Sequence, residues 1–168
     1  MSAALLEGFP PVVDDRAGVL ILGSFPSAQS LRLRQYYANP RNAFWAITAE
    51  LFGFDAEAPY DARLAALRSH RVALWDVLHR CRRAGSSDSA FDPKSLVVND
   101  FGALFAEYPT ITRVYFNGAK AAELYRRLAP RPASVAQRLE FQRLPSTSPA
   151  HATRPGVKLA AWRAIVAS

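Results

Sequence analysis

Four short apolar runs, each followed by a polar loop, limit the fold of this chain more than any other feature. Residues 19–22, 71–78, 113–116 and 142–144 have the length and composition of buried strands, and we expect 71–78 to be central. Segments with helical signals lie between and after them, at 43–54, 60–68, 100–108, 119–128 and 157–166. Alternating strands and helices favour a parallel sheet covered on both faces. The sequence therefore predicts an α/β fold, a three-layer α/β/α sandwich with a central, mainly parallel four-stranded sheet.

Length, charge and cysteine content narrow the class of protein. With 168 residues, half of them hydrophobic, the chain suits a single domain spanning 1–168. Its 21 Lys and Arg against 14 Asp and Glu favour a polyanionic partner, although an arginine-rich proteome is an equal explanation. A lone cysteine, Cys81, excludes an internal disulfide, and no Cys/His cluster has zinc spacing. We expect neither a metal nor a cofactor.

The start of the chain and its hydropathy bear on location. Glu7, Asp14 and Asp15 fall within the first twenty residues, which lack the basic start and apolar stretch of a signal peptide. No apolar run approaches the length of a membrane-spanning helix. We therefore expect a cytoplasmic, monomeric protein that does not bind membranes.

The loop after the first apolar run and the segment behind it resemble a nucleic-acid site in composition. Residues 23–27 form a tight loop at the carboxyl end of the predicted strand, where open α/β sheets bind ligands. The segment that follows interleaves aromatic, amide and arginine side chains: Tyr36, Tyr37, Phe44 and Trp45, with Asn39, Asn42, Arg32, Arg34 and Arg41. Aromatic rings stack on bases, amides read base edges, and guanidinium groups bind phosphates.

Three later loops carry weaker signals. Asp76 lies near the end of the second apolar run, Asn117 and Gly118 follow the third, and residues 146–152 follow the fourth. Each loop alone is explained as an ordinary turn or helix cap. In a parallel sheet, however, all of them would meet the first loop at one edge. A basic turn is expected at 79–83.

The loops in order resemble a known family. LGSFPS, QYYANPRNAFW, WDVL, YFNG and STSPAHA together resemble the uracil-DNA glycosylase superfamily, most closely its hypoxanthine-DNA (deoxyinosine) glycosylase branch. The resemblance spans Leu20 to Trp162. It implies a uracil-DNA glycosylase-like fold and a monofunctional DNA glycosylase of base excision repair. Such an enzyme flips a deaminated base out of DNA and hydrolyses its N-glycosidic bond without a metal. Hypoxanthine is the first expectation, with uracil or xanthine as alternatives.

The resemblance also assigns catalytic candidates. In the superfamily the first loop usually carries an Asp or Asn that positions water, whereas this chain has Phe25 there. The deoxyinosine branch also lacks that residue and is thought to use a downstream asparagine. Asn42 is therefore the first candidate and Asn39 the second. Asn117 is a further amide for the base or the water, although an Asn before Gly is also a favoured turn residue.

The base itself is expected to contact the first loop, Tyr37, Phe44 and Asp76. Gly23, Ser24 and Phe25 would face it from the loop. Phe44 matches the aromatic on which the flipped base stacks, or it is an ordinary core residue, and Tyr37 would close the other side. The Asp76 carboxylate would accept the N1 proton of hypoxanthine, or it pairs with a nearby arginine.

The remaining candidates would hold the DNA backbone. They are Ser27, Arg41, Arg82, Arg83, Ser146, Thr147, Ser148, Pro149 and His151. The serines and the threonine offer hydroxyl donors to phosphate, and His151 suits a minor-groove or phosphate contact. Lys94, Lys120 and Lys158 lie on helices or away from the loops, so no Schiff-base nucleophile is expected.

Two other classes of function remain open from the sequence. One is a catalytically inactive nucleic-acid-binding domain that kept the fold after the first loop lost its acid. The other is a hydrolase of free nucleosides or nucleotides, which would have a similar pocket. The basic segment at 79–83 argues against the second, because a free nucleoside has no phosphate backbone to bind.

Overall fold

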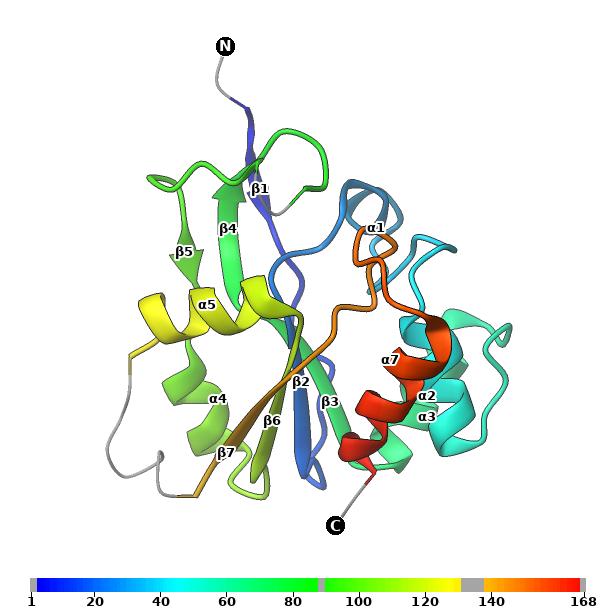
Figure 1. The fold of residues 1–168 in the computed structure, drawn as a ribbon. Helices are drawn as coiled ribbons and strands as arrows, with labels where there is room; N and C mark the ends of the chain where they lie inside the picture. The colour runs from blue at the N-terminus through cyan, green and yellow to red at the C-terminus, as the bar shows by residue number, and fades with distance from the viewer. Residues whose placement is uncertain (1–2, 88–89, 131–137, 167–168) are drawn as a thin grey trace.

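The computed structural model describes residues 3–87, 90–130 and 138–166, built around a four-stranded parallel sheet (Figure 1). Its strands are β2 (Val19–Gly23), β3 (Val72–Asp76), β6 (Arg113–Asn117) and β7 (Glu140–Leu144). They lie in the order β3-β2-β6-β7, and every neighbouring pair is parallel. The predicted parallel four-stranded sheet is therefore confirmed.

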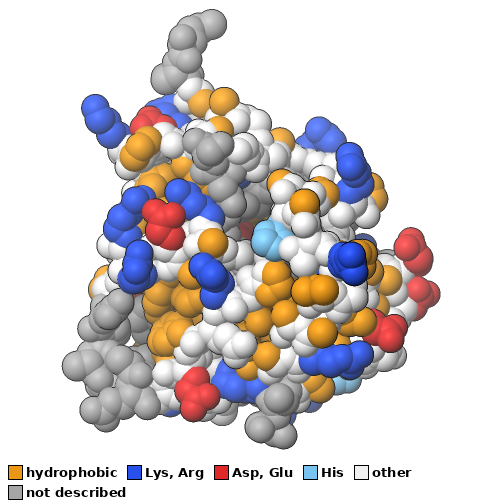
Figure 2. All heavy atoms as spheres, viewed as in Figure 1, with side chains coloured by type: hydrophobic (Ala, Val, Ile, Leu, Met, Phe, Trp, Pro, Cys, Tyr) orange, Lys and Arg blue, Asp and Glu red, His pale blue; other side chains and the backbone are white. Residues whose placement is uncertain are grey.

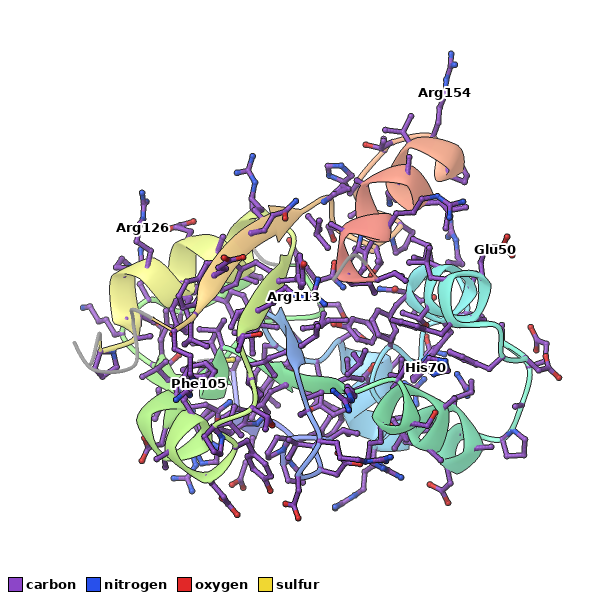
Figure 3. All side chains as sticks on the ribbon, turned by 90° about the horizontal axis from the view of Figure 1, so that it is seen from below. Glu50, His70, Phe105, Arg113, Arg126 and Arg154 are labelled. Carbon is purple, nitrogen blue, oxygen red and sulfur yellow. The ribbon has the colours of Figure 1, made fainter. Side chains whose placement is uncertain are left out.

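Helices cover both faces of this sheet, as the view from below shows (Figure 3). Alternate residues of β2 explain the layers, because successive side chains of a strand point to opposite faces. Leu20 and Leu22 belong to the core beneath α4 (Phe101–Glu107) and α5 (Ala119–Leu128). Val19 and Ile21 belong to the opposite core. The helices on that side are α2 (Phe44–Phe52), α3 (Tyr60–Ser69) and α7 (Pro155–Trp162). The three-layer prediction is confirmed.

The second apolar run differs from its prediction in two ways. It divides at Val77, so that β3 ends at Asp76 and β4 (Leu78–Arg82) joins a second, antiparallel sheet with β1 (Leu5–Glu7) and β5 (Val97–Val98). The basic turn expected at 79–83 is therefore wrong, since most of it is strand. The central position expected for this run is also wrong, because β3 lies at one end of the sheet order.

The N-terminal segment explains why an end strand is so apolar. Val12 forms an isolated bridge to Leu74, with backbone N–H···O distances of 2.9 Å in both directions. This contact covers the outer side of β3, and all five residues of the strand are buried. The end position of β3 is thus hidden from solvent.

The helix boundaries follow local signals. Gly53 adopts a φ of 74° and ends α2 at the expected point, and Asp100 caps α4 by accepting a hydrogen bond from the Ala103 N–H. Helix α1 (Ala28–Leu33) was not expected. It begins at Ser27, whose hydroxyl oxygen accepts from the Ser30 N–H. A short 3₁₀ helix, η2 (Arg163–Ile165), follows α7.

The carboxyl ends of all four parallel strands point to the same end of the molecule, the upper end in Figure 1. The small sheet of β1, β4 and β5 continues above this end. None of the helices in the described part of the chain has both the length and the apolar character needed to cross a membrane.

Candidate active site

A cavity of about 540 Å³ lies at the carboxyl ends of the parallel strands. The loops after β2 and β7 line it, together with the last residues of β3 and β6 and the segment between α1 and α2. Of the residues predicted from sequence, the cavity collects Gly23, Ser24, Phe25, Ser27, Tyr37, Asn39, Asn42, Asp76, Asn117, Ser146, Thr147, Ser148 and Pro149. The expectation that these loops meet at one edge is met in the geometry. The roles of the individual side chains remain predictions.

Asp76 is the acidic residue among the described lining of this cavity. It ends β3 opposite Gly23 of β2 and is only 4% exposed. Its Oδ2 is buried and has no hydrogen-bond partner among the described residues. Burial raises the pKa of Asp76 to about 7, while the positive charge of Arg83 works against the rise.

Gly23 is required by the close approach of this carboxyl group. A Cβ atom at position 23 would lie 2.5 Å from Asp76 Oδ1 and 3.4 Å from the Tyr37 hydroxyl. The first distance is far inside van der Waals contact. The glycine therefore lets the Asp76 side chain lie against the backbone of β2.

Arg83 contacts the first loop through a hydrogen bond to Pro26 and through the ring of Phe25. It is only 4% exposed, and its guanidinium group donates to the carbonyl oxygens of Gly85 (2.7 Å) and Pro26 (2.8 Å). The guanidinium carbon also lies 5.3 Å from the ring centre of Phe25. Because this side chain is inside the protein and binds loop carbonyls, the structure does not favour the predicted phosphate contact.

Tyr37 covers Phe44. The two rings stack with their centres 4.0 Å apart and their planes 22° from parallel. Phe44 is fully buried and does not line the cavity, whereas Tyr37 does. This position favours the alternative that Phe44 is a core residue, and its stacking role stays a prediction. Burial, helped by the nearby Asp76, raises the pKa of Tyr37 well above its ordinary value, so its hydroxyl stays protonated.

The amide of Asn117 is fully engaged in joining the last loop to the sheet. Its Nδ2 donates to Thr147 Oγ1 (2.9 Å) and to the Tyr37 hydroxyl (3.3 Å), and its Oδ1 accepts from the Thr147 N–H (2.9 Å). These bonds fit a positioning role better than the predicted role in holding water or a base.

The other two asparagines have side-chain oxygens that accept hydrogen bonds from nearby backbone groups. Asn42 Oδ1 accepts from the Phe44 N–H at the start of α2, and Asn39 Oδ1 accepts from the Arg41 N–H, each at 2.9 Å. Both residues line the cavity. Each side-chain oxygen is thus fixed by the backbone, which orients the amide before any ligand arrives.

Hydroxyl groups form the rim near the last loop. Ser146 Oγ accepts from the Ser148 N–H (3.1 Å), and Ser148 Oγ accepts from the Ala150 N–H (3.2 Å). A serine that accepts from the backbone still has its own O–H to donate. Each of these serines thus keeps a hydroxyl proton that it can donate.

Lys158 forms a hydrogen bond to the same loop. The sequence does not predict this contact. Its Nζ donates to the Ser148 carbonyl oxygen at 3.2 Å, and the residue is only 5% exposed. Burial lowers the pKa of its ammonium group. The contact joins α7 to the rim of the cavity, between residues ten positions apart in the sequence. No local sequence pattern indicates it.

Comparisons of this chain with a family model and with known proteins agree on one family. The family model of the uracil DNA glycosylase superfamily matches residues 10–165. The chain belongs to this superfamily. A hypoxanthine DNA glycosylase of Methanosarcina acetivorans is 35% identical, over 95% of this chain and 96% of its own. Another from Methanosarcina barkeri is 39% identical over 70% of this chain and 73% of its own.

A solved structure has the same fold. It is an NMR structure in solution of a Methanosarcina acetivorans protein described as a uracil DNA glycosylase. The TM-score is 0.80 at 35% identity, with 96% of each chain covered. The first loop of this chain carries Phe25, which lines the cavity and is 7% exposed. Its ring cannot polarise water.

Four predicted DNA contacts do not line the cavity. Arg41 and His151 are exposed, and each is next in sequence to a residue that lines the cavity. Arg82 lies on β4 with its guanidinium group donating to the Ala3 carbonyl oxygen at 2.7 Å, and Arg83 is buried. Ser86 and Ser87 line the cavity but were not predicted as site residues, because serines in a polar loop carry no distinctive sequence signal.

Metal binding has no support in the described part of the chain. Among residues 3–87, 90–130 and 138–166, no three His, Cys, Asp or Glu side chains gather as metal ligands.

Proposed function

We propose that this protein is a monofunctional DNA glycosylase of base excision repair. It takes a deaminated base out of DNA into the cavity and hydrolyses its N-glycosidic bond, with hypoxanthine as the preferred base and uracil or xanthine as further substrates. The observation that carries the proposal is the cavity itself. It brings an aromatic ring, a carboxyl group, two oriented amides and a hydroxyl rim to one place in a chain of this superfamily.

Each part of the cavity suits a step of that reaction. Tyr37 and Asp76 both line the cavity. The ring of Tyr37 would stack on the flipped base, and the Asp76 carboxyl group would contact its polar edge. Ser146 and Ser148 offer hydroxyl donors to the phosphate groups on either side of the flipped nucleotide. Flipping costs a few kcal/mol and costs least for a mispaired base, which favours deaminated bases over normal ones.

The chemistry is best explained by an amide that orients water. The first loop has no carboxylate, and Asp76 ends a different strand. The Asn42 amide, held by its bond to the Phe44 N–H, would place a water molecule against C1′ of the sugar. With a weak activator of water, the bond to the base must break first, so the sugar passes through an oxocarbenium-like state.

A Schiff-base mechanism has no suitable lysine among the described residues. No lysine lines the cavity, and Lys158 donates to the Ser148 carbonyl oxygen. The enzyme would therefore release the base and leave an abasic site. We propose that it acts as a monomer on DNA, because one chain supplies all the described lining residues of the cavity. We also propose a cytoplasmic location, because its DNA substrate lies inside the cell.

Incubation with damaged duplexes tests this function. Duplexes carrying inosine, uracil, xanthine or no damage are incubated with the protein and then treated with alkali to cleave abasic sites. We expect cleavage of the inosine duplex first and none of the undamaged duplex. Borohydride treatment should trap no protein–DNA adduct. Binding to all duplexes without base release would instead indicate an inactive nucleic-acid-binding domain.

A further inference from the structure

Asp76 has a buried oxygen that nothing in the described structure satisfies. Its Oδ2 has no hydrogen-bond partner, although the residue lines the cavity. Its backbone, by contrast, is well held, since Asn99 Nδ2 donates to the Asp76 carbonyl oxygen at 2.8 Å. A buried polar atom without a partner costs free energy, so such an atom at a cavity is a candidate to bind a ligand.

The groups around Asp76 favour its neutral form. Arg83 is the cation that acts on it, and Nε and one Nη of this side chain already donate to the Gly85 and Pro26 carbonyl oxygens. Burial, with a smaller contribution from Asp76, raises the pKa values of Tyr36, Tyr37 and Tyr60, so these phenols stay neutral. Burial therefore outweighs the arginine, and the pKa of Asp76 lies near 7.

We propose that Asp76 works as a neutral carboxylic acid whose O–H donates a hydrogen bond to the keto oxygen of the deaminated base. This inference rests on the proposed glycosylase function and names the group that recognises its substrate. A carboxylic acid offers a donor and an acceptor side by side. Hypoxanthine offers the complementary pair, the O6 acceptor and the N1–H donor. The carbonyl oxygen of the acid would accept from that N1–H, the contact that the sequence predicts for the carboxylate.

The departing base explains why the donor is needed. When the bond from C1′ to the base breaks, its electron pair stays with the base, and water adds to C1′ and releases a proton. The negative charge spreads over the ring to the keto oxygen. A proton donor there stabilises this charge, whereas a carboxylate would repel it.

Protonation fixes the sign of the pH effect. Below its pKa Asp76 carries the proton and the cavity is active, and above its pKa the proton is lost and the rate falls. The single-turnover rate of inosine release should therefore fall about tenfold for each pH unit above the pKa of Asp76. The opposite slope, a rate that rises through neutral pH, belongs to a carboxylate that accepts the N1 proton.

Paired variants test the assignment. Asp76→Asn replaces the acid with an amide that keeps an N–H donor at every pH. The matched control is Asp61→Asn, the same change at an exposed position in the first turn of α3. Single-turnover rates on inosine duplex are measured from pH 5.5 to 9. We expect the alkaline fall in the wild type and in Asp61→Asn, and a flat profile in Asp76→Asn. The shape of the profile is the readout, whatever the absolute rate of the variant.

The outcomes separate this inference from the proposed function. If the wild type releases inosine's base but Asp76→Asn keeps the same alkaline fall, the inference is wrong and the function stands. If the wild type releases no deaminated base at any pH, both are wrong. Should Asp76→Asn not fold, ¹³C NMR of the wild-type Asp76 carboxyl carbon answers the question. We expect titration near neutral pH, and a carboxylate already ionised at pH 5 would overturn the inference.

Discussion

Hydroxyl, amide and aromatic side chains line the cavity, whereas the arginines that give the chain its net charge of +7 lie elsewhere. No lysine or arginine is among the described lining residues. Lysine and arginine side chains are instead spread over the visible face, with apolar groups between them (Figure 2). Figure 3 shows Arg126 and Arg154 pointing away from α5 and α7.

This division matches two different tasks. Charges on the outside attract the DNA backbone over long range without reading its sequence. A neutral cavity can bind a neutral base without the cost of removing water from a cation. Arg83 shares one property with each region, because it is charged but buried. The following predictions test whether the two regions act separately.

The largest effect is expected inside the cavity. Asn42→Ala should slow base release from inosine duplex about a hundredfold in single turnover, because an oriented amide acts mainly in the transition state. Affinity for the duplex should change little. Asn39→Ala is the matched control. A full rate in Asn42→Ala with a slow Asn39→Ala would transfer the role to Asn39, and two fully active variants would remove amide catalysis from this segment.

The next effect concerns stability. Arg83→Met should lower the free energy of unfolding by about 2 kcal/mol, because the Gly85 and Pro26 carbonyl oxygens lose a buried charged donor. Urea denaturation measures this change. Arg80→Met, at an exposed neighbour on β4, is the control and should be close to wild type. Full stability in Arg83→Met, with a reduced salt dependence of DNA binding, would return Arg83 to the charged exterior.

A smaller effect is expected at the floor of the cavity. Gly23→Ala should slow base release about tenfold, since the new Cβ must displace the Asp76 carboxyl group. Gly18→Ala is a suitable control, because an added Cβ at Gly18 meets nothing within 4 Å. Equal single-turnover rates for Gly23→Ala and wild type would show that the position of Asp76 does not matter to the reaction.

The smallest effect belongs to the surface. Arg41→Ala should weaken binding a few fold, equally for damaged and undamaged duplexes, and reduce the slope of log K against log salt by about 1. Fluorescence anisotropy across salt concentrations measures both quantities. A loss confined to the inosine duplex would show that Arg41 reads the flipped nucleotide, and the division between cavity and surface would fail there.

The sequence predicts the main sheet well because its strands are buried and apolar. It fails for β1, β4, β5 and α1, which have two to six residues each and no clear periodicity. Their pairing depends on distant partners, as in the register of Leu5 with Arg82. Short elements of this kind are set by tertiary contacts rather than by local preference.

The site shows the same limit at the level of side chains. Motif order identifies the loops, and the loops meet as expected at one cavity. It does not show that Tyr37 covers Phe44, because Tyr37 adopts a φ of 54°, which non-glycine residues rarely do. Nor does it show that Arg83 points inward or that Lys158 reaches Ser148. The direction in which a long side chain points is decided by tertiary packing. A single sequence does not show that packing.

The walls of the cavity are tied to each other as well as to the sheet. The Ala43 N–H donates to the Thr147 carbonyl oxygen at 2.9 Å, next to Asn42 on one wall and beside Ser146 and Ser148 on the other. The distance from the asparagine segment to the serine rim is therefore fixed by the main chain. If the rim holds a DNA strand as proposed, the sugar of that strand would lie at a set distance from Asn42, so the backbone contacts would also position the bond to be cut.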